Sequence, residues 1–196
     1  MVKKLTKYNI IELYLNNYGK SIYLRELASL IGKPHQTVKP YVEELVKEKI
    51  LLKNARKNIV EYSLNFKESK VYDYIIISEK EKLIERLNKD ILLKTLLEKL
   101  SMSFEKNTFV IFGSAVSQIN KGSDIDLLII GDDNIIKIIK EFEDIYDKKI
   151  HKVQVKNLNG LTLTFAKEIY KKHLILNNTE AVIRFFGGLH GQNKLV

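Results

Sequence analysis

Apolar residues recur at helical spacing through the first third of the chain, with glycine, asparagine or proline between the runs. The predicted helices cover residues 5–18, 24–31 and 36–50. A short extended piece at 21–23 precedes the second helix, and Gly32 ends that helix. Pro40 is placed in the first turn of the third helix, where a missing N–H costs little. Two apolar runs then flank the polar, basic residues 54–58 and predict a β-hairpin with strands at 50–53 and 59–64.

Good helix formers dominate the middle of the chain. Residues 79–100 carry apolar side chains on one helical face and predict a long amphipathic helix, while the apolar run 71–77 fits either a strand or a helix. Beyond residue 107 strands and helices alternate, which favours an α/β or α+β arrangement. The expected strands are 108–112, 124–130 and 150–155, and the expected helices are 134–146, 163–173 and 180–186.

Two carboxylates interrupt the second of these C-terminal strands. Asp124 and Asp126 are two residues apart, so in a strand their side chains project from the same face. Like charges this close repel each other unless a cation lies between them. Mg²⁺ suits such a pair, because it is commonly held by one or two carboxylates and by substrate phosphates. A solvated strand end is the plain alternative for the two aspartates.

A glycine–serine turn precedes the carboxylates by nine residues. Gly113 lets the backbone approach a phosphate closely, and the Ser114 hydroxyl can hold a phosphate oxygen. With this turn, the segment VIFGSAVSQINKGSDIDLLII resembles the signature of the DNA-polymerase-beta-type nucleotidyltransferase superfamily. Residues 107–196 also resemble the minimal members of that superfamily in size.

This resemblance implies a divalent-metal-dependent transfer of a nucleotidyl group from ATP or another nucleoside triphosphate to a protein or small acceptor. The implied catalytic and Mg²⁺-binding residues are Asp124 and Asp126, and the implied nucleotide-binding residues are Gly113, Ser114 and Ser123. Some minimal members act as antitoxins that adenylylate a toxin, which implies a toxin-like protein partner.

One departure from the superfamily pattern concerns the third carboxylate, which active members usually carry on a later strand. The best-aligned position in the strand 150–155 holds Gln154, a poor Mg²⁺ ligand. Asp144 and Asp147 lie just upstream, on or after a predicted helix. The four histidines have no metal-ligand spacing and are interpreted as structural or incidental, with His35 also a candidate DNA contact.

The N-terminal order of helix, short strand, helix, turn, helix and hairpin resembles a winged helix-turn-helix domain, a common prokaryotic DNA-binding module. In such a module the start of the third helix meets base edges, and the tip of the wing reaches phosphate or the minor groove. The implied DNA-binding residues are Lys33, His35, Gln36, Thr37, Lys39, Arg56 and Lys57. A solvated basic face that serves only protein interaction is the alternative.

Charge supports an anionic partner for the N-terminal part. The chain of 196 residues has a net charge of +9, and residues 1–65 hold twelve Lys and Arg against six Asp and Glu. The absence of cysteine excludes disulfides and thiolate sites and suits a cytoplasmic protein. No apolar run reaches the length of a membrane span, so we expect no membrane association.

The expected fold class is α+β, in three parts. These are a winged helix-turn-helix DNA-binding domain at 1–65, a helical linker at 66–106 and a small α/β nucleotidyltransferase domain at 107–196. Two functions stay open: a nucleotidyltransferase coupled to a winged helix that binds double-stranded DNA, and a transcriptional regulator whose transferase fold is a vestigial nucleotide sensor. A homodimer stays open as well. The glycine-rich tail 185–191 is interpreted as a flexible terminus rather than as a phosphate loop.

Overall fold

The structure, a computed structural model, describes residues 4–56, 59–119 and 122–195. Backbone contacts divide the chain into two compact units. The first unit contains Met1–Glu79 and Phe186–Val196, and the second contains Lys80–Phe185. The division after Glu79 falls inside the segment expected to be a linker, and the domain bounds 1–65, 66–106 and 107–196 stay a prediction.

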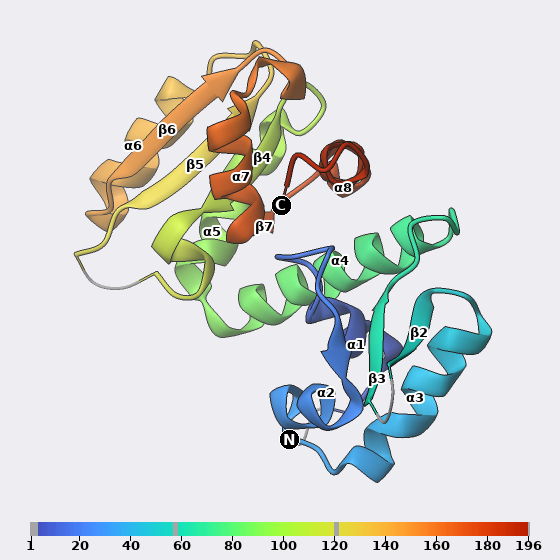
Figure 1. The fold of residues 1–196 in the computed structure, drawn as a ribbon. Coiled ribbons are helices and arrows are strands. Elements are labelled where there is room, and N and C mark those ends of the chain that lie inside the picture. Colours follow the sequence, from blue (N-terminus) through green and yellow to red (C-terminus); the bar gives the residue numbers. More distant parts are fainter. Residues whose placement is uncertain (1–3, 57–58, 120–121, 196) are drawn as a thin grey trace. The chain divides into compact units, whose positions relative to one another are not determined.

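The first unit joins three short helices to a small antiparallel sheet (Figure 1). Its elements are α1 Lys7–Glu12, β1 Ile22–Tyr23, α2 Leu24–Ile31, α3 His35–Lys47, β2 Leu51–Arg56, β3 Ile59–Leu64 and the start of α4 Val71–Lys89. The strands lie in the order β1-β3-β2, and β2 pairs with β3 from Leu51 opposite Leu64 to Arg56 opposite Ile59. The predicted second helix and the predicted hairpin are confirmed, but β2 continues through residues 54–56, which were expected in the turn.

Two helices of this unit differ from their predicted bounds. α1 is only six residues long, because the chain continues in tighter turns after Glu12. α3 ends at Lys47, and Lys49 has a positive φ of 62° that turns the chain into β2. Pro40 is the sixth residue of α3 and thus lies in the second turn, so its placement in the first turn was wrong.

The expected long helix at 79–100 is two helices, α4 and α5 Ile91–Leu100. Asp90 separates them in an extended conformation and caps α5 by accepting a hydrogen bond of 3.0 Å from the Leu93 N–H. Its other carboxylate oxygen forms an ion pair of 3.1 Å with Arg86. A side chain that satisfies an exposed N–H of the new helix stabilises this break.

The second unit is a four-stranded mixed sheet with helices on both faces (Figure 1). Its elements after α5 are η1 Ser101–Ser103, β4 Thr108–Phe112, η2 Gly113–Val116, β5 Ile125–Ile130, α6 Ile136–Tyr146, β6 Ile150–Val155, η3 Leu158–Gly160, α7 Leu163–Lys171, β7 His173–Ile175 and the first part of α8 Thr179–Gly191, whose residues from Phe186 onward belong to the first unit. The strand order is β6-β5-β4-β7, in which only the β5–β6 pair is parallel.

The strand β7 was not predicted, because its apolar residues continue the pattern of the preceding helix. Lys172 is extended and ends α7, and His173 then pairs with Phe112. The mixed topology confirms the α+β fold class.

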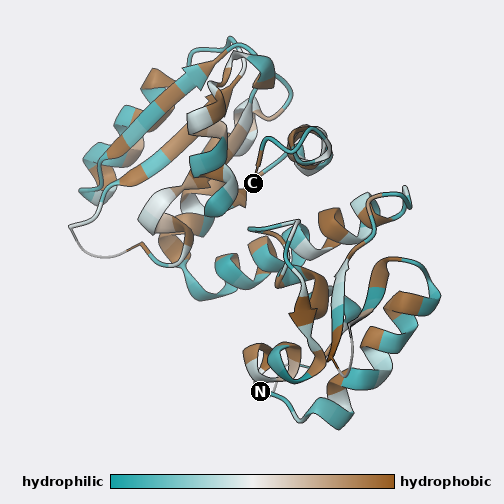
Figure 2. Ribbon diagram, in the orientation of Figure 1, coloured by the Kyte–Doolittle hydropathy of each residue, from teal (hydrophilic) through white to brown (hydrophobic). Residues whose placement is uncertain are grey.

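One face of the sheet carries the main core of this unit. Side chains from β4, β5 and β6 pack there against α5 and α6, and the fully buried members include Phe109, Leu127, Leu96 and Phe142. Figure 2 shows the mixture of hydrophilic and hydrophobic residues along α6 that lets one side of the helix cover the sheet. The opposite face lies beneath α7, where the Phe165 ring contacts the Phe112 ring edge-on at 5.3 Å.

We expect Asn177→Ala to destabilise the second unit by about 2–3 kcal/mol, because it strands buried backbone groups. The Asn177 side chain accepts a hydrogen bond of 2.8 Å from the Phe109 N–H and donates one of 2.8 Å to the Asn107 carbonyl. Thermal or urea unfolding measures the loss. Asn88→Ala, at an exposed position of α4, is the control and should leave the midpoint in place. Equal midpoints for the two variants would contradict the role given to Asn177.

The glycine-rich tail is helical, so its interpretation as a flexible terminus was wrong. α8 continues to Gly191, and Phe186 is buried. Within the first unit the His190 ring lies 4.7 Å from the Phe66 ring and 5.9 Å from the Tyr18 ring. Burial in this aromatic cluster lowers the pKa of His190, because the charged form is poorly solvated there. Across the described residues, we find no helix long and apolar enough to cross a membrane.

Candidate functional site

The glycine–serine turn stands at the end of β4, next to a carboxylate of β5. Phe112, the last residue of β4, pairs with Asp126, and Gly113 follows with a positive φ of 69°. A Cβ at this glycine would lie 2.5 Å from Asp126 Oδ2. The backbone angle favours glycine, and a Cβ here would force the Asp126 carboxylate to shift. Because Gly113 has no side chain, the turn can lie directly against the Asp126 carboxylate.

The two aspartates share one face of the sheet, as the sequence predicts. Asp126 lies in β5, and Asp124 comes one residue before the strand begins. Between and beyond them, Ile125 and Leu127 point into the core on the other face. The side chains of Asp124 and Asp126 are 40% and 32% exposed, so both carboxylates are open to a ligand from solvent.

The side chain that β6 brings to this pair is His151, not Gln154. His151 pairs with Asp126 in the parallel register. Its Nε2 lies 3.3 Å from Asp124 Oδ2, and its Nδ1 lies 3.7 Å from Asp126 Oδ1. The sequence interpretation of His151 as structural or incidental did not anticipate these two contacts. The strand expected to supply a third carboxylate therefore places an imidazole beside Asp124 and Asp126.

Gln154 lies three residues further along β6 and binds elsewhere. Its Nε2 donates to the backbone carbonyls of Gly131 at 3.0 Å and Asp133 at 3.2 Å. The alignment of Gln154 with the third carboxylate was wrong because the register opposes Ile125 to Ile150, which places Gln154 opposite Ile129. Aligning the two buried isoleucines that begin β5 and β6 is the sequence signal that would have identified His151.

The remaining predicted nucleotide contacts flank the carboxylates in sequence. Ser114 is exposed in η2, immediately after Gly113. Ser123 is half-buried directly before Asp124, and its carbonyl accepts a hydrogen bond of 3.5 Å from Lys148 Nζ. Ser114 thus follows Gly113 directly, and Ser123 directly precedes Asp124.

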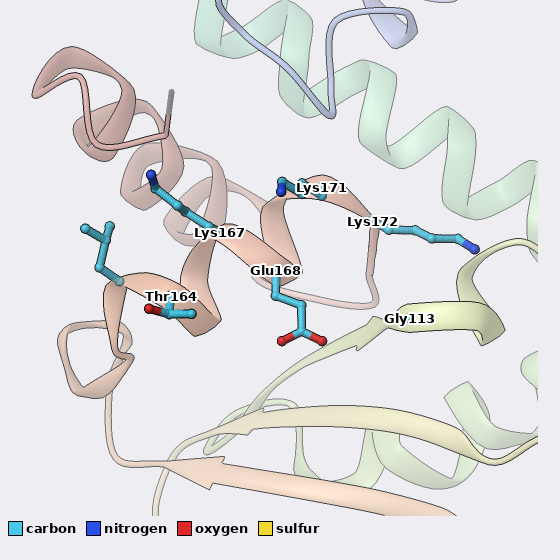
Figure 3. Close-up of a pocket in the computed structure, with 7 residues that line it drawn as sticks. Gly113, Thr164, Lys167, Glu168, Lys171 and Lys172 are labelled. Carbon is cyan, nitrogen blue, oxygen red and sulfur yellow. The ribbon is translucent and has the colours of Figure 1, made fainter.

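A basic cavity adjoins the turn, and sequence reasoning did not identify it. It has a volume of about 500 Å³. It is lined by Gly113 together with Leu163, Thr164, Lys167, Glu168, Lys171 and Lys172 (Figure 3). Thr164, Lys167, Glu168 and Lys171 recur at helical spacing, so one face of α7 is polar while Ala166, Ile169 and Tyr170 are buried on the other. The sequence shows this periodicity, but it does not show that α7 lies next to Gly113.

Arg86 holds the turn η2 in position from α4. Its Nε donates a hydrogen bond of 2.9 Å to the Val116 carbonyl, and its guanidinium also forms the ion pair with Asp90. The side chains of Arg86 and Asp90 are only 15% and 12% exposed. Hydrogen bonds from a charged donor at a largely buried position fix the backbone that follows Gly113 and Ser114.

We expect Arg86→Met to destabilise the second unit by about 2–3 kcal/mol, because Asp90 loses its partner and the η2 carbonyl loses its donor. The loosened turn should also weaken binding of a nucleoside triphosphate. Unfolding curves and a binding titration with ATP check the two effects. Lys89→Met is the matched control, since Lys89 is 66% exposed and forms an exposed ion pair with Glu85 on the same helix. A normal unfolding midpoint for Arg86→Met would refute the role of this arginine.

The carboxylates of Asp124 and Asp126 suit one hard cation that also binds the phosphates of a substrate. Carboxylate oxygens are the ligands that Mg²⁺ prefers, and the cation usually takes further oxygens from substrate phosphates. Among the described residues, no group of three or more His, Asp or Glu side chains is placed to hold a metal alone. Asp124 and Asp126 therefore fit a cation shared with a phosphate better than they fit a cation bound by protein alone.

The residues predicted to contact DNA belong to the first unit. His35, Gln36, Thr37 and Lys39 are exposed at the start of α3, and Lys33 is half-buried before it. Lys39 forms an exposed ion pair of 3.6 Å with Glu43. Arg56 ends β2, and Lys57 lies outside the described residues.

Comparison with known proteins places the site within a known domain type. Residues 94–181 match the family model described as polymerase beta, nucleotidyltransferase. None of the curated proteins matches the chain. The toxin-antitoxin MntA-HpeT, solved in a mutant form, is 14% identical over 51% of this chain and 88% of its own, with a TM-score of 0.38.

A second solved structure, HmgR from Pseudomonas aeruginosa, is 16% identical over 94% of this chain and 72% of its own, with a TM-score of 0.28. Both overlaps are too loose to carry a functional role to this chain. The family match spans β4, the Gly113 turn, both aspartates, β6 and α7. Residues 94–181 are therefore similar to a nucleotidyltransferase domain of the polymerase beta family.

Proposed function

We propose that the second unit transfers a nucleotidyl group from ATP or another nucleoside triphosphate to a hydroxyl of a protein or small acceptor. In this reaction the acceptor oxygen forms a bond to the α-phosphorus. The bond from that phosphorus to the oxygen of the β-phosphate breaks, pyrophosphate leaves, and the hydroxyl proton passes to solvent. A toxin-like protein is the protein acceptor that the superfamily resemblance suggests.

The single observation that supports this proposal most strongly is the contact between Gly113 and Asp126. A phosphate that approaches the backbone at Gly113 lies directly beside the carboxylate, because even a Cβ at this position would lie 2.5 Å from Asp126 Oδ2. The adjoining cavity adds the lysines of α7, whose charge suits a polyphosphate tail. The negative charges of the carboxylate and the phosphate repel each other, and a cation bound between them would remove this repulsion.

Mg²⁺ is the cation that this donor set fits, with Asp124 and Asp126 as its protein ligands. When bound, it supplies neutralisation of the phosphate charge in the transition state. The protein's own part is positional: the turn at Gly113 and Ser114 holds the triphosphate, and the rigid strand β5 fixes both carboxylates. Close orientation of the reacting groups accelerates the transfer further.

Labelled nucleotides test the proposal. The full chain is incubated with Mg²⁺, candidate acceptors and ATP labelled at either the α- or the γ-phosphate. Nucleotidyl transfer attaches the α-label and releases the γ-label in pyrophosphate. Attachment of the γ-label would identify phosphoryl transfer and overturn the proposal. Loss of the α-label signal in Asp124→Asn ties the reaction to this site.

A second candidate function, a regulator that binds a nucleotide without transferring it, is favoured by His151. The His151 imidazole lies within 3.7 Å of both aspartates, on the strand where the superfamily resemblance led us to expect a third carboxylate. A sensor of this kind binds ATP saturably, forms no labelled acceptor and changes the DNA affinity of the chain. Measuring DNA binding with and without ATP separates the two functions.

We also propose that the first unit binds double-stranded DNA through α3 and the β2–β3 hairpin. Three buried side chains, Val38, Val42 and Leu45, fix one face of α3 to the unit, which leaves the polar side chains at its start exposed. That placement is the one a recognition helix requires. The basic residues at the end of the hairpin supply phosphate contacts.

For Arg56→Gln and Lys57→Gln we expect the slope of log affinity against log salt to flatten by about one unit each, because each variant releases one fewer counterion. Fluorescence anisotropy with a duplex across a salt series measures the slope. Lys94→Gln, on α5 of the other unit, serves as the charge control. Slopes that match that of the wild-type protein would rule out the hairpin contact.

A further inference from the structure

The strand that carries His151 is an open edge of the sheet. In the order β6-β5-β4-β7, β6 has a neighbour only on the β5 side among the strands the structure describes (Figure 1). Four consecutive residues of β6, His151, Lys152, Val153 and Gln154, are exposed. An edge strand with unpaired backbone groups is a template for pairing with another chain.

The hydrogen bonds of the β5–β6 ladder show which backbone groups face outward. The Ile125 N–H donates to the Lys149 carbonyl, and the Gly131 N–H donates to the Val155 carbonyl. Since alternate residues of a parallel strand bond to the same neighbour, the odd-numbered residues of β6 face β5. Lys152 and Gln154 consequently direct their N–H and C=O groups away from the sheet.

The charge along this edge selects the kind of chain that can pair with it. Lys149, Lys152 and Lys156 are exposed, and the sequence from 148 to 167 contains no Asp or Glu. Pairing with a second copy of β6 would bring these lysines together, which is unfavourable because like charges on paired strands repel each other. An acidic segment gains both the backbone hydrogen bonds and the opposite charge.

We propose that the outer edge of β6 binds an acidic, extended segment of a partner protein as a fifth strand of the sheet. The segment lies about 5 Å from β6 and about 10 Å from β5. His151 connects this edge to the site, because the same residue contacts Asp124 and Asp126. That the docked protein is also the acceptor of the nucleotidyl group rests on the proposed function, whereas the docking does not.

Amide hydrogen exchange of the full chain tests the docking directly. The probe is a short synthetic peptide that alternates glutamate with valine, and the control peptide has lysine in place of glutamate. At 90% occupancy, exchange at Lys152 and Gln154 should slow about tenfold, since only the free fraction exchanges. The amides of His151 and Val153, which already bond to β5, should change little. Protection by the lysine peptide, or none at Lys152 and Gln154, would overturn the proposal.

A proline variant provides the second readout. Lys152→Pro removes an outward N–H without taking a hydrogen bond from β5, and proline is accepted on edge strands. It should weaken peptide binding at least about tenfold relative to Lys152→Ala, which loses the same charge but keeps the N–H. Unchanged exchange at the β5 amides shows that the sheet stays intact. Equal affinity of the two variants would contradict strand addition.

The labelled-nucleotide assay separates this proposal from the proposed function. Peptide-dependent protection at β6 without any transfer of the α-label sustains the docking and refutes the transferase. Transfer of the label without protection at Lys152 and Gln154 sustains the transferase and refutes the docking. A single-stranded oligonucleotide that competes with the peptide but leaves these two amides unprotected would assign the basic edge to nucleic acid and refute the docking.

Discussion

Asp126→Asn is expected to reduce nucleotidyl transfer by about a thousandfold while the second unit stays folded. The variant removes one of the two carboxylates that are proposed to hold Mg²⁺. Charge stabilisation by a bound cation contributes several kcal/mol to such a transition state, and about 4 kcal/mol corresponds to a thousandfold in rate. The fold should tolerate the change, because asparagine has the same size and the repulsion between Asp124 and Asp126 disappears.

The control for this variant is Asp144→Asn, which changes the same charge at an exposed position of α6. Transfer rates at saturating nucleotide and thermal unfolding are measured for both proteins. A rate for Asp126→Asn within a factor of a few of the wild-type rate would show that the carboxylate pair is not the catalytic centre.

For Gly113→Ala we expect a loss of transfer comparable to that of Asp126→Asn and a destabilisation of about 2–3 kcal/mol. A φ of 69° is strained for alanine and costs about 1 kcal/mol. The new methyl group would also lie 2.5 Å from Asp126 Oδ2, so the carboxylate must move away from its position beside the turn. Movement of the Asp126 carboxylate would take it away from the proposed Mg²⁺ position, although its negative charge stays in the protein.

Gly32→Ala is a matched control, because Gly32 has the same φ of 69° and nothing within 4 Å of an added Cβ. It should show the cost of the backbone angle alone. The difference in unfolding free energy between the two variants then measures the contact with Asp126, and only Gly113→Ala should affect nucleotide binding. An active, nucleotide-binding Gly113→Ala protein would contradict the role assigned to this glycine.

Local patterns were sufficient to predict most elements and the centre of the site. β4 and β5 are short apolar runs bounded by polar turns, and their ends fix where Gly113 and Asp126 fall. Because β4 and β5 pair antiparallel, the last residue of one strand meets the early residues of the other. The spacing between turn and carboxylates therefore predicted a real juxtaposition.

What the sequence did not reveal depends on contacts between distant segments. His151 faces the aspartates because of the register of a parallel pair, and a helix separates β5 from β6 along the chain. The polar face of α7 became part of the site only because that helix crosses the face that carries Phe112 and Asp126. Three-residue β7 and the break at Asp90 were hidden by residues that continue the neighbouring helical patterns.

The central claim, that Asp124, Asp126 and the turn at Gly113 form a Mg²⁺-dependent nucleotide site, is tested most directly by calorimetric titration with ATP. We predict saturable binding to one site in the presence of Mg²⁺ and binding at least about a hundredfold weaker in its absence, because the carboxylates and phosphates then repel each other. The doubly substituted chain, Asp124→Asn with Asp126→Asn, should lose this dependence on Mg²⁺. Equal affinity with and without Mg²⁺ in the wild-type chain would contradict the account.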